Sequence, residues 1–83
     1  MPIDSVWYEV MEECGYRCVL CGQKAVSVQE IIPRSHAGNW QDKDNRVPLC
    51  NMCHVKVQDK PALYADDLRA GRDRLKLIFT HGH

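Results

Sequence analysis

The sequence lacks the long apolar segments that would assign it to a membrane or a secretory pathway. No apolar run approaches the roughly 20 residues that are needed to span a bilayer. The N-terminal segment MPIDSVWYEV has neither the basic residues nor the apolar stretch of a secretory signal. We therefore expect a cytosolic (cytoplasmic) protein with no membrane partner. Repeats, low-complexity tracts and linkers are also missing, so residues 1–83 are expected to form a single domain.

The chain also lacks an excess of charge of either sign, because 11 Lys and Arg side chains balance 11 Asp and Glu side chains. Strong nonspecific binding to nucleic acid is therefore not expected. The charges are unevenly distributed, however. Residues 1–13 contain four acidic residues and no Lys or Arg, whereas basic residues outnumber acidic ones over residues 14–60. This distribution is compatible with a local basic surface formed by the middle of the chain.

The cysteines, in contrast, are arranged in a specific pattern. Four of the five cysteines form two CxxC pairs, Cys18 with Cys21 and Cys50 with Cys53. Two intervening residues let both sulfurs of a pair reach one ion, and two such pairs complete a tetrahedral site. A chain this short often needs such support for its small core, and in a reducing compartment the pattern favours metal over disulfides. The sequence therefore predicts a structural Zn²⁺ ion bound by these four cysteines.

Hydrophobic periodicity and capping residues divide the chain into short elements. The expected order is a helix over residues 4–14, a strand over 25–32, a polar loop over 33–44, a short strand over 46–49, and helices over 51–58 and 61–78. The last helix has four apolar residues as its predicted buried side: Leu63, Leu68, Leu75 and Ile78.

The residues between and after the cysteine pairs follow a distinctive order. The chain contains Ile31-Ile32-Pro33-Arg34-Ser35, then Ala37-Gly38, then Asp44-Asn45-Arg46-Val47-Pro48-Leu49-Cys50, and finally Cys53-His54. In this order it resembles the HNH endonuclease family, in the subtype with two CxxC pairs. The resemblance covers about residues 16–58. It implies an α+β fold, a small zinc-stapled ββα-metal domain (HNH or His-Me finger) with flanking N- and C-terminal helices.

The resemblance also implies an activity, namely metal-dependent cleavage of phosphodiester bonds in DNA. The family mechanism uses a His on the first strand as general base, an Asn that holds the region before the second strand, and a His on the helix that binds a divalent ion. Asn45 matches the central Asn and His54 matches the helix His. Related sequences usually have His-His or Asp-His before the Ile-Ile-Pro run, whereas this chain has Gln29-Glu30. Glu30 therefore occupies the position of the base.

This departure leaves three interpretations open. In the first, Glu30 acts as the base or as a ligand of Mg²⁺ or another divalent ion, because such ions prefer oxygen ligands. In the second, His36 folds back from the loop and supplies an imidazole. In the third, the site is degenerate, and the domain is a zinc module that binds nucleic acid or protein without cleavage.

The resulting prediction is a catalytic set of Glu30, Asn45 and His54, with Glu30 and His54 as candidate ligands of the catalytic ion. DNA is the expected partner. Three basic side chains are predicted to contact its phosphates: Arg34, Arg46 and Lys56.

Overall fold

A computed structural model of the chain describes residues 3–32 and 42–80, and these residues form three α-helices around a two-stranded antiparallel sheet. The elements in chain order are α1 (Ser5–Glu13), β1 (Ser27–Glu30), the 3₁₀ helix η2 (Lys43–Asn45), β2 (Arg46–Leu49), α2 (Asn51–Asp59) and α3 (Pro61–Thr80). The predicted α+β order of elements is confirmed. β1 is shorter than the predicted 25–32, because its ladder with the four-residue β2 runs only from Ser27 opposite Leu49 to Glu30 opposite Arg46.

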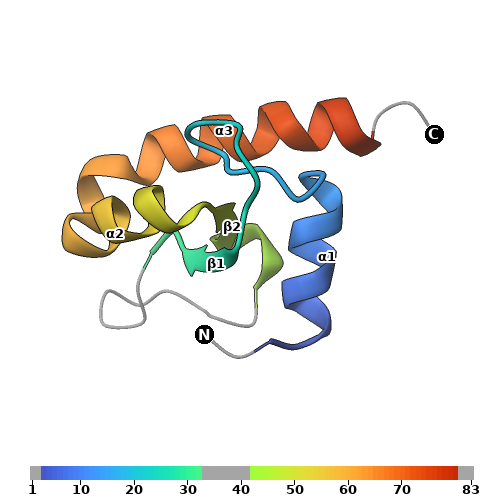
Figure 1. The fold of residues 1–83 in the computed structure, drawn as a ribbon, viewed down its shortest axis with the longest axis horizontal. Coiled ribbons are helices and arrows are strands. Elements are labelled where there is room, and N and C mark those ends of the chain that lie inside the picture. The colour runs from blue at the N-terminus through green and yellow to red at the C-terminus, as the bar shows by residue number, and fades with distance from the viewer. Residues whose placement is uncertain (1–2, 33–41, 81–83) are drawn as a thin grey trace.

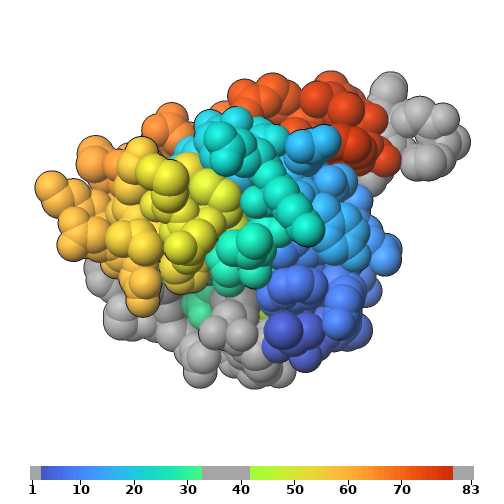
Figure 2. All heavy atoms as spheres, viewed as in Figure 1, coloured from blue at the N-terminus to red at the C-terminus, as the bar shows by residue number. Residues whose placement is uncertain are grey.

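The sheet is covered on both faces, with α1 on one side, α2 on the other, and α3 across both helices (Figure 1). One core cluster lies between the sheet and α1 and contains Val10, Met11, Ala25 and Val28. A larger cluster on the other face includes Val47, Leu49, Val57, Leu68 and Leu75. All four residues of β2 are buried, as expected for a strand enclosed on two sides. Little of the sheet is visible in the space-filling view (Figure 2).

Asp4 fixes the start of α1 to β2. Its carboxylate accepts a hydrogen bond from the backbone N–H of Trp7 at 2.8 Å, which caps the helix. The same carboxylate pairs with the guanidinium of Arg46, 2.9 Å away. The hydrogen bond from Arg46 holds the pKa of Asp4 below its usual value. Since the Arg46 side chain has no exposed surface, this pair provides the carboxylate that a buried cation requires.

α3 packs on the rest of the protein mainly through its middle. Leu68 and Leu75 are buried, but Leu63 is 67% exposed and Ile78 is 63% exposed. The prediction that Leu63 and Ile78 are buried is therefore wrong. A helix of this length extends about 30 Å, which is most of the 36 Å long axis of the molecule, so its ends project beyond the core. None of the helices in the described segments has the combination of length and apolar character that crossing a membrane requires.

Candidate functional site

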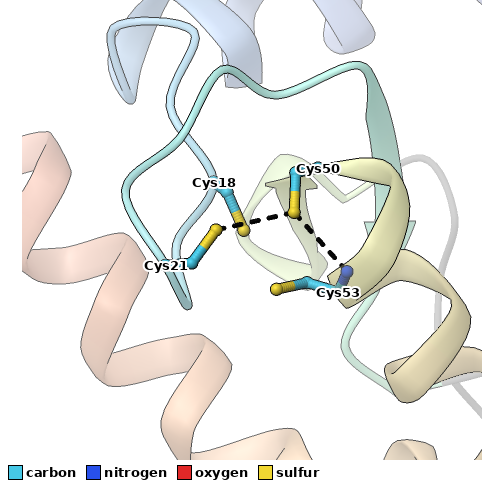
Figure 3. A group of neighbouring side chains, drawn as sticks. All are labelled: Cys18, Cys21, Cys50 and Cys53. Atoms are coloured by element: carbon cyan, nitrogen blue, oxygen red, sulfur yellow. Dashed lines mark hydrogen bonds between the residues drawn. The ribbon is translucent and has the colours of Figure 1, made fainter.

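Four cysteine side chains from two separate segments meet beside the sheet (Figure 3). Cys18 and Cys21 lie in the turn before β1, Cys50 is the N-cap of α2, and Cys53 lies in the first turn of that helix. Their sulfurs all lie within 4.8 Å of one another. Sulfurs around one zinc ion, with Zn–S bonds of about 2.3 Å, are roughly 3.8 Å apart. The four thiols are thus positioned to bind one metal ion, which is consistent with the predicted structural zinc.

The turn that carries the first pair is closed by backbone hydrogen bonds. Cys18 N donates to Gln23 O at 2.7 Å, and Gly22 N donates to Cys18 O at 2.9 Å. Gly22 has a φ of +78°, a left-handed conformation that favours glycine. Val19 N donates to Pro48 O at 3.2 Å. The first pair is therefore held against the strand that leads directly to the second pair.

The sulfurs of the second pair have different environments. The backbone N–H of Cys53 donates to the Cys50 sulfur at 3.5 Å, and this hydrogen bond lowers the pKa of Cys50 to about 7. A thiolate at a helix N-terminus is a ready metal ligand. Burial raises the pKa of Cys53, so metal binding has to displace its proton. The fifth cysteine, Cys14, belongs to the core, and burial raises its pKa to about 11.

Asn45 clamps the residues that follow β1. Its side-chain oxygen accepts from Ile32 N at 2.9 Å, and its side-chain nitrogen donates to Ile32 O at 2.9 Å. The backbone adds a third link, because Ile31 N donates to Asn45 O at 2.7 Å. Asn45 is itself buried at the end of η2. One amide side chain thus fixes the separation of the two strands where the ladder ends.

His54 lies on α2 and faces β1 through one hydrogen bond. Its Nδ1 lies 3.1 Å from the hydroxyl oxygen of Ser27. That hydroxyl in turn donates to the carbonyl oxygen of Leu49 at 3.4 Å. In the tautomer that carries the imidazole proton on Nδ1, this nitrogen donates to the Ser27 hydroxyl oxygen while the Ser27 proton is used for Leu49. The lone pair is then on Nε2, the nitrogen that can bind a cation.

A family model for HNH endonuclease matches residues 12–60, which include both cysteine pairs, the Asn45 clamp and His54. The chain belongs to the HNH endonuclease family. Comparison with curated proteins and with solved structures gives no match. The clustered cysteines fit the zinc-binding subtype of HNH domains, and the two strands and the following α2 fit the ββα-metal fold.

Within this HNH domain, Glu30 lies on a different face of the sheet from His54. Side chains alternate along a strand. Ser27 and Gln29 therefore project towards α2, whereas Val28, which packs against α1, and Glu30 project the other way. One carboxylate oxygen of Glu30, Oε2, is buried without a hydrogen-bond partner. Gln29 is thus the residue of this pair that shares a face with His54.

The structure gives different positions to the predicted phosphate contacts. Lys56 is exposed on α2. Arg46 is fully buried against Asp4, so its guanidinium is not available to a phosphate on the surface. Arg34 and the alternative imidazole, His36, lie outside the described residues.

Ser27 is the residue of this site that sequence reasoning did not identify. A serine near the start of a strand has no distinguishing pattern by itself. The one available signal was the alternation of side chains along a strand, which places Ser27 on the same face of β1 as Gln29. In the described part of the chain, the four cysteines are the one cluster of three or more Cys, His, Asp or Glu side chains arranged to hold a metal ion.

Proposed function

We propose that this HNH domain is a metal-dependent endonuclease that cleaves phosphodiester bonds in DNA. The observation that carries the proposal is the hydrogen-bond chain from His54 through Ser27 to the Leu49 carbonyl. A histidine that binds a metal commonly donates its other N–H to a neighbouring group, which fixes the tautomer and the ring orientation. His54 has this arrangement in the tautomer that carries its proton on Nδ1.

The other residues are assigned roles by their positions. A divalent ion, when bound, stabilises the negative charge that develops on the phosphate. His54 Nε2 is the proposed nitrogen ligand, and the amide oxygen of Gln29 lies on the same face as an oxygen donor. Asn45 is a positioning residue that holds the end of β1 through Ile32. Glu30 keeps the predicted role of general base, which would require its carboxylate to reach the face of the sheet that carries His54.

Lys56 is the proposed phosphate contact among the described residues, because it is exposed on the helix that carries His54. Arg34 keeps this role as a prediction from its positive charge in the sequence. Arg46 is left out of the proposed interface, because its guanidinium is buried against Asp4. Moving it to a phosphate on the surface would break this ion pair, which is costly.

A second candidate function is binding of nucleic acid or protein without cleavage, and a specific observation favours it. Glu30 projects away from His54, and its neighbour Gln29 has no ionisable group. A neutral amide cannot act as a general base. If Glu30 does not reach the substrate, the domain retains the clamp and the helix His without a group that activates water.

Nicking of supercoiled plasmid separates the two functions. The zinc-loaded chain is incubated with Mg²⁺, Mn²⁺ or Ni²⁺, beside the variants His54→Ala and Glu30→Gln. We expect His54→Ala to lower the nicking rate at least about 100-fold, because the ion loses its nitrogen ligand. Glu30→Gln keeps the size of the side chain and removes the base, for which a loss of about 100-fold is expected.

Met52→Ala is the matched control, since Met52 lies on the same helix and is 73% exposed. Its nicking rate should equal that of the unmodified chain. Nicking that persists in His54→Ala would identify a contaminating nuclease and reject the proposal. Absence of nicking with all three ions, together with retained binding of duplex DNA, would favour the second candidate.

A further inference from the structure

A pocket of about 340 Å³ opens between α3 and the turn that leads into β2. Its lining consists of Ile31, Asp44, Arg69, Arg72, Asp73 and Lys76. Three of these side chains are cationic and two are anionic, so the lining carries a charge of +1. The zinc cysteines and His54 are not part of it.

Arg72 is the unusual member of this pocket. Its side chain is only 7% exposed, and its terminal nitrogen Nη2 donates to Glu13 and to Asp44, each at 3.3 Å. Its Nε is buried and has no hydrogen-bond partner. A buried donor without an acceptor is costly. Because this atom has almost no accessible surface, an acceptor in the pocket would reach it after a small shift of the Arg72 side chain, and it would then remove that cost.

The carboxylates beside Arg72 are already shared among several cations. Glu13 accepts a hydrogen bond from Lys43 at 2.9 Å and also faces Lys76 at 3.8 Å. The hydrogen bond that Lys43 donates to Glu13 raises the pKa of Lys43. Glu13 and Asp44 thus face three cations, Lys43, Arg72 and Lys76. The group that lacks a partner is an N–H donor on a cation, so the expected partner is an anionic acceptor.

The pocket also adjoins the clamp at the end of the sheet. Two of its lining residues, Ile31 and Asp44, are the chain neighbours of the clamped Ile32 and of Asn45. A ligand in the pocket would therefore lie next to the segment whose position the family mechanism depends on.

We propose that this pocket binds a phosphate group, with Arg72, Arg69 and Lys76 as its donors. Phosphate has several acceptor oxygens and pairs well with the edge of a guanidinium. Two sources have this chemistry, a free phosphate and a phosphodiester of bound DNA. The second source rests on the proposed function, and the first does not.

The test follows the Arg72 Nε–H signal by NMR in the zinc-loaded chain without Mg²⁺. Inorganic phosphate is added at constant ionic strength, and a short duplex oligonucleotide is added in a parallel titration. We expect a saturable shift of this signal in both titrations. A shift with phosphate alone supports the pocket and rejects DNA as the source. No shift in either titration overturns the proposal.

Two variants exclude a general effect of charge. Arg72 contributes to the buried network, so Arg69→Gln is used instead, because Arg69 is half exposed and makes one distant ion pair with Asp66, 3.7 Å away. Its loss should weaken phosphate binding about five- to tenfold. Arg17→Gln removes the same charge from an exposed residue outside the pocket and should leave the affinity unchanged. Equal losses in both variants would overturn the proposal.

Nicking measured on the same preparations keeps this test separate from the proposed function. Failure of the phosphate titrations with nicking still dependent on His54 would reject the pocket alone. Phosphate binding by an inactive chain would reject the nuclease proposal and support the pocket.

Discussion

The two ends of the sheet differ in how completely they retain the pattern of the family. At the end where Ser27 pairs with Leu49, the chain continues into Cys50, and four thiols from two segments meet. At the other end, the Asn45 clamp is present, but Gln29-Glu30 replaces the usual pair. The two features that hold the architecture together are therefore present, one at each end of the sheet. The departure from the family pattern is confined to the two residues that end β1.

The largest expected effect separates a metal-binding cysteine from a core cysteine. Cys53→Ala removes one of the four clustered sulfurs, so we expect loss of bound zinc and unfolding, because the energy of ion binding is also folding energy. Cys14→Ala is the matched control at a buried cysteine outside the cluster. It should retain one zinc ion per chain and lose about 1 kcal/mol of stability. Zinc content and thermal melts, with and without a chelator, measure both. Equal melting temperatures for the two variants would contradict a stabilising role of the cysteine cluster at this end of the sheet.

A smaller effect is expected at the clamp. Asn45→Ala deletes two hydrogen bonds to Ile32, which should lower the free energy of unfolding by about 2 kcal/mol. The zinc content should not change, since the cysteines lie at the other end of the sheet. Urea unfolding measures the change, and Asn51→Ala, at an exposed residue, should stay within about 0.5 kcal/mol of the unmodified chain. Loss of zinc in Asn45→Ala would mean that the two ends are coupled.

A substitution at Gly71 tests how closely α3 packs on the turn that carries the first cysteine pair. A Cβ at this position would overlap the carbonyl oxygen of Val19, in the turn between the first two cysteines. At an open helical position, replacement of Gly by Ala stabilises by about 1 kcal/mol. Here the backbone contact should reverse the sign, so Gly71→Ala is expected to destabilise the chain by about 1–2 kcal/mol. A higher melting temperature in the variant would contradict close packing of α3 on this turn.

The smallest effect is expected for Asp4→Asn, because the Asp4 side chain is one-third exposed and the amide keeps an oxygen acceptor for Trp7 and Arg46. The depressed pKa of Asp4 means that its stabilising contribution is present above the usual Asp value and is lost only as the pH falls through the lower folded value. Asp4→Asn should therefore lower the melting temperature by a few degrees, less than Gly71→Ala does. The difference from the unmodified chain should stay constant between about pH 8 and pH 5. A difference that shrinks as the pH falls through this range would contradict a lowered pKa of Asp4.

The metal cluster and the order of elements could be predicted because both depend on local patterns. The CxxC spacing specifies ligand geometry by itself, and the four-residue β2 was predicted at its observed bounds, 46–49. The exposure of Leu63 and Ile78 could not be predicted, because it depends on how far α3 extends beyond its partners.

The candidate catalytic site was less accessible to sequence reasoning, since its geometry depends on contacts across the sheet. The placement of Glu30 on the opposite face of the sheet from His54 depends on the register of β1 and β2. The burial of Arg46 requires the position of α1, whose N-cap supplies its partner. Arg72 resembled one charge among several on an exposed helix face, and only tertiary packing places it beside Glu13 and Asp44.

X-ray absorption at the zinc edge shows whether one ion joins the two cysteine pairs. We expect one zinc ion per chain, bound by four sulfur atoms at about 2.3 Å and by no nitrogen or oxygen atom. A shell with fewer sulfurs, or protein that binds no zinc when its thiols are reduced, would contradict it.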